Sequence, residues 1–215
     1  AFNANFYYMK YKDQLVLTGE LTDVGYAVMA NVPNSYRAGV ELIVGIKPVS
    51  WLKVDLNTTL SRNIIEDYTN YIDVYDNPDD WNPLPQEATD LGSTTISFSP
   101  SVVGSSQVSV MPFKSFTFSW ISKYVGSQYI DNTQSSSREL GAYWVNNLKA
   151  EYRFAVKGAK SIFLQGMVNN VFNRKYVSNG WIYRAKFLDD GSWYVEDGYF
   201  PQAEINFTFR LGVEF

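Results

Sequence analysis

The chain has 215 residues, with 18 Lys and Arg, 22 Asp and Glu, a net charge of -4 and neither His nor Cys. Without imidazole or thiolate side chains, sites for zinc, copper, haem iron or iron-sulfur clusters are excluded, as is catalysis by Cys or a His-based triad. The acidic balance excludes a nucleic-acid binder, which needs a basic face.

Aromatic residues make up 17% of the chain. Such enrichment is typical of crowded interfaces and of the two rims of a membrane-spanning barrel. No apolar run reaches the ~18 residues that a membrane-spanning helix requires, so any span must be made of strands.

Apolar and polar residues alternate with a period of two in eight segments, which predicts strands with one apolar and one polar face. In chain order these segments are Phe2–Tyr8, Arg37–Ile46, Leu52–Ser61, Val102–Val110, Phe116–Trp120, Asn147–Phe154, Ile162–Asn169 and Glu204–Phe215. The last is the clearest, because every position in it obeys the alternation. Strands of about ten residues are longer than those of most soluble sandwiches and favour a membrane barrel.

The connections between these segments alternate in length. Short turns are expected at Lys47–Ser50, Pro112–Ser115 and Ala155–Lys160, and long polar loops at Gly19–Asn34, Ile64–Thr95, Gly126–Gly141 and Asn173–Pro201, the last with its own hairpin around Asp189–Gly191. An antiparallel meander with short turns at one end and long loops at the other is the arrangement of outer-membrane barrels.

The polar phase of the strands is expected to face the barrel interior. It carries charges of both signs, and we expect a ladder of cross-strand pairs. These residues are Arg37, Glu41, Lys53, Asp55, Lys149, Glu151, Arg153, Arg210 and Glu214.

The segment Ile64–Asp90 is rich in carboxylates and is expected to be a mobile surface loop. Asp73, Asp76, Asp79 and Asp80 are weak candidates for a cation site, because their spacing lacks the Gly and bidentate Glu of an EF-hand loop. Asp79 and Asp80 are adjacent on an extended chain and point apart, which disfavours a catalytic carboxylate pair. We therefore expect no enzyme and no bound cofactor.

Aromatic residues of the last long loop are the candidates for ligand contact. Trp181, Tyr183, Trp193 and Tyr194 could hold a planar or sugar ligand, although such rings more often pack loops on one another.

Several motifs resemble TonB-dependent outer-membrane receptors. VNNVFNRKYVSNGW at Val168–Trp181 is similar to the penultimate-strand motif of that family, and Gly198–Phe215 to its closing strand. Asn31–Leu42 and Ser122–Thr133 resemble further parts of these receptors. The C-terminal aromatic residues Phe207, Phe209 and Phe215 resemble the signal that the barrel assembly machinery reads.

The resemblance implies an all-β chain, residues 1–215, forming about eight strands at the C-terminal end of a 22-stranded barrel in the outer membrane of a Gram-negative bacterium. The plug domain, the TonB-contacting segment and the N-terminal strands are expected to lie outside it. The resemblance implies uptake of a scarce small-molecule ligand, with a ferric siderophore, haem or cobalamin favoured over a glycan. Two alternatives stay open, namely a complete small eight-stranded barrel with a structural or adhesive role and a soluble carbohydrate-binding β-sandwich.

Overall fold

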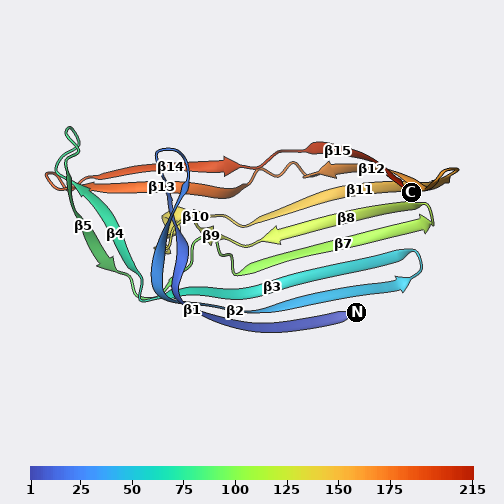
Figure 1. The fold of residues 1–215 in the computed structure, drawn as a ribbon, viewed down its shortest axis with the longest axis horizontal. Helices are drawn as coiled ribbons and strands as arrows, with labels where there is room; N and C mark the ends of the chain where they lie inside the picture. Colours follow the sequence, from blue (N-terminus) through green and yellow to red (C-terminus); the bar gives the residue numbers. More distant parts are fainter.

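The computed structural model describes residues 1–215 and contains one long antiparallel sheet. Its main strands follow one another in space in chain order: β1 (Phe2–Leu21), β2 (Ala27–Val49), β3 (Leu52–Glu66), β7 (Val102–Phe113), β8 (Phe116–Val125), β11 (Tyr143–Val156), β12 (Ala159–Asn169) and β15 (Asn206–Glu214) (Figure 1). A short strand, β6 (Thr94–Thr95), also pairs with β3. The predicted meander of eight strands is confirmed.

The sheet is open. Strands β1 and β15 are its two outer members and are not hydrogen-bonded to each other. The chain therefore does not close into a small barrel of its own, as expected for a sector of a larger one.

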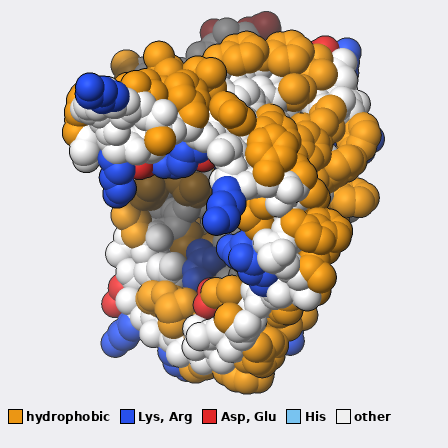
Figure 2. Space-filling view, turned by 90° about the vertical axis from the view of Figure 1, so that its right-hand side faces the viewer, with side chains coloured by type: hydrophobic (Ala, Val, Ile, Leu, Met, Phe, Trp, Pro, Cys, Tyr) orange, Lys and Arg blue, Asp and Glu red, His pale blue; other side chains and the backbone are white.

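The pairing register places apolar residues of neighbouring strands side by side on one face. Leu56 of β3, for example, lies opposite Val44 of β2, and Leu164 of β12 lies opposite Leu211 of β15. This face is open to the surroundings, with Phe209 84% exposed. Figure 2 shows hydrophobic side chains around the outside of the wall and charged side chains in the hollow. The apolar phase is therefore the outer, lipid-facing surface.

The three expected short turns lie together at one end of the sheet, on the right in Figure 1. They join β2 to β3, β7 to β8 and β11 to β12 with two residues between the strands. Gly158 supplies the positive φ of 95° in the last of them, a conformation that glycine adopts without steric cost.

The prediction of a long loop at Gly19–Asn34 is wrong for most of these residues. Strands β1 and β2 continue as a paired hairpin that turns only between Leu21 and Ala27. Their distal halves stay paired because apolar residues there form a small buried core. Its members are Val16, Val32, Ile65 and Ile96.

The remaining long loops also form strands. The predicted hairpin in the last loop is confirmed as β13 (Val177–Phe187) and β14 (Trp193–Pro201). The acidic segment forms a second hairpin, β4 (Thr69–Tyr75) and β5 (Pro83–Asp90), and β4 pairs in parallel with β13. The segment Ile64–Asp90 is therefore not the irregular loop that was expected, and its mobility stays a prediction. A small hairpin of β9 (Gln128–Tyr129) and β10 (Glu139–Leu140), with the 3₁₀ turn η1 (Ser136–Arg138), completes this end.

The interior charges pair less regularly than a cross-strand ladder. Lys53 pairs with Asp55 at 2.8 Å, two residues along the same strand. Arg153 contacts Glu151 of its own strand at 3.3 Å and Glu214 of β15 at 2.7 Å. The ladder prediction is wrong in detail, because side chains two residues apart on one strand share a face and meet as readily as those on neighbouring strands.

Phe163 is an interior aromatic residue that depends on a glycine. Its ring lies directly over Gly212 of β15, and the guanidinium carbons of Arg153 and Arg210 lie 5.1 and 5.2 Å from its centroid. A side chain at position 212 would occupy the space of the ring.

We expect Gly212→Ala to lower the free energy of unfolding by about 1 to 3 kcal/mol, the usual cost of overpacking. Gly141→Ala is the matched control, because no atom lies within 4 Å of a Cβ placed there. Denaturant unfolding of the purified intact barrel measures both, and equal midpoints for the two variants would contradict the packing argument.

Candidate functional site

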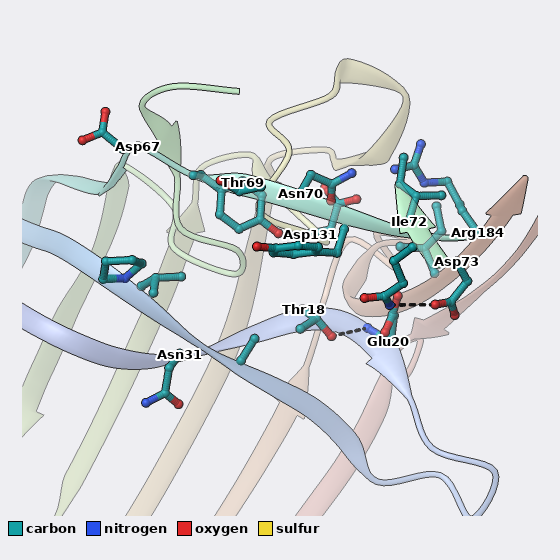
Figure 3. A pocket seen from close by; sticks show the side chains of 17 residues that line it. Thr18, Glu20, Asn31, Asp67, Thr69, Asn70, Ile72, Asp73, Asp131 and Arg184 are labelled. Carbon is teal, nitrogen blue, oxygen red and sulfur yellow. Dashed lines mark hydrogen bonds between the residues drawn. The ribbon is translucent and has the colours of Figure 1, made fainter. Parts of the chain in front are cut away.

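A cavity of about 430 Å³ lies at the loop end of the sheet, opposite the short turns. The β1–β2 hairpin forms one side of it, and the strands β4 and β13 form the other. Glu20, Asp73 and Arg184 come together at one end of the cavity, from three segments far apart in the sequence (Figure 3). Most of the other lining residues are polar, among them Thr18 and Asn31.

The β1–β2 hairpin is held over the interior by side chains of the following loops. The carbonyl oxygen of Leu17 accepts hydrogen bonds from Asn132 Nδ2 at 2.7 Å and from Ser97 Oγ at 2.8 Å. Gly19 has a φ of 96°, and a Cβ there would lie 2.9 Å from the carbonyl oxygen of Ile130. Only glycine permits this close approach, which fixes the position of Glu20 one residue further on.

A buried ion pair supports the wall of the cavity beneath the hairpin. Asp131 Oδ2 lies 2.7 Å from Arg138 Nε, and the two side chains are only 8% and 10% exposed. Thr133 donates to the other carboxylate oxygen of Asp131 from its backbone N–H and its hydroxyl. Because both oxygens are occupied, Asp131 is fixed in its place at the cavity edge.

The cavity is acidic. Glu20, Asp67, Asp73 and Asp131 line it against the single cation Arg184. Burial raises the pKa of Glu20, and the nearby charges of Asp73 and Asp131 raise it further. Burial likewise lowers the pKa of Arg184. These directions describe a partly desolvated pocket that favours neutral or positively charged groups.

The aromatic candidates do not line this cavity. Two residues of β13 line the cavity, Ile182 and Arg184. Trp181 and Tyr183 occupy the alternate positions of the same strand and point to its other face. The hydroxyl of Tyr183 donates to Asp73 Oδ2 at 3.1 Å and lies 3.1 Å from the hydroxyl of Tyr75. Burial and these partners raise its pKa.

The other two aromatic candidates lie on β14. Tyr194 packs edge-on against Trp81, with centroids 5.0 Å apart. Trp193 is 47% exposed, and the guanidinium of Arg184 lies 5.5 Å from its ring. Tyr183 and Tyr194 thus help pack the loop strands together, and ligand contact by the four rings stays a prediction.

The four candidate cation ligands are not gathered into one cluster, and no group of three carboxylates suited to a metal ion occurs. Asp73 accepts from Gln86 Nε2 at 2.8 Å. Asp76 accepts from Asn82 Nδ2 at 2.6 Å, which lowers its pKa and closes the turn between β4 and β5. Asp79 and Asp80 are exposed in that turn. The proposed assembly-signal residues Phe207, Phe209 and Phe215 all lie exposed on β15 or just after it.

Sequence reasoning missed Glu20, Asp131 and Arg184. Each stands in a segment that was expected to be loop, and nothing in the spacing of three residues so far apart indicates that they meet. Arg184 carried one usable signal, since it alternates with aromatic residues in a stretch long enough to be a strand.

A family model described as TonB dependent receptor-like, beta-barrel, matches residues 1–171. No curated protein sequence matches the chain. Three solved structures share its fold: the ferric-catecholate import receptor Fiu of E. coli K12 (15% identity, TM-score 0.57), the siderophore receptor PiuA of Acinetobacter baumannii (13%, 0.60) and the ferric yersiniabactin uptake receptor FyuA of Yersinia pestis (14%, 0.56). The matches cover 97%, 98% and 100% of this chain but 24%, 25% and 27% of those receptors. The chain thus spans about a quarter of their length.

Proposed function

The chain belongs to the TonB-dependent receptor β-barrel family, and from that premise we propose that it forms the C-terminal part of an outer-membrane uptake receptor. Proteins of this family are transporters of the Gram-negative outer membrane and not enzymes. We propose that the remaining strands, a plug domain and the contact with TonB come from other parts of the whole protein, and that the barrel assembly machinery inserts it.

The observation that carries the proposal is the position of the acidic cavity. It lies at the loop end of a wall whose outer face is apolar, and in outer-membrane barrels the long loops face the exterior. Four separate segments of the loop end build it: the β1–β2 hairpin, the β4–β5 hairpin, the loop that carries Asp131, and β13. A ligand arriving from outside reaches this cavity first.

Ferric siderophores are the ligand class that we propose. The three structural relatives are described as a ferric-catecholate import receptor, a siderophore receptor and a ferric yersiniabactin uptake receptor. The charge of the cavity favours one part of this class. Even with Asp131 neutralised by Arg138, the carboxylates that line the cavity outnumber its single guanidinium, so they repel a strongly anionic ferric tricatecholate. A neutral or cationic complex, such as a ferric trihydroxamate, suits it better.

Calorimetric titration of the intact receptor tests this ligand class. We expect a cationic ferric trihydroxamate to bind more tightly than a ferric tricatecholate. Glu20→Gln should weaken binding of the cationic complex about threefold to tenfold, the size of a partly screened charge interaction of roughly 1 kcal/mol. Asp23→Asn, in the exposed turn of the same hairpin, makes the same chemical change outside the cavity and should leave the affinity unchanged.

The pH dependence follows from the raised pKa of Glu20. Below that pKa the carboxyl is neutral and attracts a cation less, so affinity for the cationic complex should fall as pH decreases through it. Glu20→Gln should remove this dependence. Tighter binding of the tricatecholate, or an unchanged pH profile in the variant, would contradict the proposed ligand charge.

A further inference from the structure

A hollow on the outer face of the wall lies near the short turns. Four residues of adjacent strands stand side by side across it, namely Phe118, Ala150, Gly166 and Phe209. The two middle residues are the smallest in the row, while the outer two carry full rings. The ring of Phe209 leans over Gly166, with ring carbons 3.6 and 3.8 Å from where a Cβ would stand there. The surface is therefore depressed over Ala150 of β11, beside this ring.

The hollow is a groove of about 570 Å³ with apolar edges. The next row toward the turns closes it with Phe116, Tyr152, Leu164 and Leu211, which again stand side by side. Tyr152 and Leu164 remain 45% and 50% exposed. An open groove of this shape on a lipid-facing wall has the dimensions and the chemistry to take a hydrocarbon chain.

Lysines stand at the turns beyond the groove. Lys114 lies in the β7–β8 turn, and Lys157 and Lys160 lie at the β11–β12 turn. All three are exposed and none forms an ion pair, and neither turn contains Asp or Glu. The carboxylate of Glu214 on the adjoining strand feels the charge of Lys160 but is held by Arg153, 2.7 Å away.

The spacing between groove and lysines suits a lipid. Lys114 is two residues from Phe116, and Lys157 is five residues from Tyr152. At about 3.3 Å per residue along a strand, the lysines of the two turns lie roughly 7 to 16 Å from the groove residues. An acyl chain lying in the groove therefore brings its headgroup to the level of the lysines.

We propose that this groove and these lysines form a binding site for an anionic phospholipid of the periplasmic leaflet. The short turns face the periplasm in barrels of this kind, which places the site in that leaflet. Basic residues at a membrane surface attract anionic headgroups. A second copy of the chain fits less well, because a symmetric contact would bring the same lysines against one another.

Native mass spectrometry of the intact receptor, released from detergent micelles supplemented with defined lipids, tests the site. The probes are dioleoyl phosphatidylglycerol, phosphatidylethanolamine and phosphatidylcholine at equal concentration. We expect one phosphatidylglycerol to be retained in preference to the other two. Replacing Lys114, Lys157 and Lys160 together by Gln should reduce that preference about a hundredfold. Each lysine is expected to contribute a factor of about ten or less.

Two further variants separate the parts of the site. Ala150→Leu fills the groove with an apolar side chain suited to a lipid face, so it should lower retention of all three lipids while the receptor stays folded. Lys47→Gln removes a lysine near the end of β2, away from the groove, and should change nothing. Equal retention of the three lipids by the unaltered receptor, or full retention by Ala150→Leu, overturns the proposal, as does a lipid-independent dimer that protects the groove.

Discussion

Leu56→Arg is expected to lower the free energy of unfolding of the intact barrel by about 2 to 4 kcal/mol, the cost of an Arg on the lipid face near the bilayer midplane. Leu56 lies on the outer face of β3, four residues beyond its first residue, and is 41% exposed to the surroundings. Its neighbours Val44 and Ser106 offer no carboxylate that could neutralise the guanidinium. Leu211→Arg on β15 is expected to behave in the same way.

The next residue along the strand provides the control. Asn57 points to the interior, where its side-chain amide donates to Ser105 Oγ at 2.8 Å. Asn57→Arg should cost less than about 1 kcal/mol, because the new charge meets water and other polar groups instead of lipid. Reversible unfolding in lipid vesicles measures both variants. A larger loss for Asn57→Arg than for Leu56→Arg would mean that the two faces of the wall are assigned the wrong way round.

The wall of the barrel was predictable because each of its strands separates two different environments. Lipid on one side and a polar interior on the other impose a period of two along every strand. Apolar and polar residues accordingly alternate at Phe207–Val213 of β15. The short turns were predictable for a related reason, since antiparallel neighbours that follow one another in the chain need only two residues to reverse direction.

The loop end was not predictable in the same way. Its strands pair with remote partners, as β4 does with β13, and no local pattern states which pairs form. The residues of the candidate site are harder still to predict, because a shift of one residue along a strand moves a side chain to the opposite face of the sheet. Tyr183 and Arg184 are neighbours, yet only Arg184 lines the cavity. Trp181 and Tyr183, the ligand-contact candidates on this strand, occupy the positions that alternate with Ile182 and Arg184 and do not line the cavity.

Arg138→Met is the substitution expected to damage the candidate site most. It leaves the carboxylate of Asp131 buried without its partner, and breaking a buried ion pair in this way costs about 3 to 5 kcal/mol. The loss should fall on local stability, seen as faster amide hydrogen exchange at Ile130 and Leu140, which pack together in a small core. Lys186→Met breaks the more exposed pair with Glu87, 2.6 Å apart, and should cost less than about 1 kcal/mol.

The double variant Asp131→Leu with Arg138→Met distinguishes a lost partner from lost packing. Replacing a buried ion pair by apolar side chains of similar size is often close to neutral, so the double variant should regain most of the local protection that Arg138→Met loses. Binding should not recover with it, because the carboxylate of Asp131 lines the cavity, whereas the guanidinium of Arg138 that balances its charge does not. Stability and affinity for a cationic ligand are therefore expected to separate in the double variant. Recovery of both together would show that Asp131 supports the cavity wall without influencing the ligand.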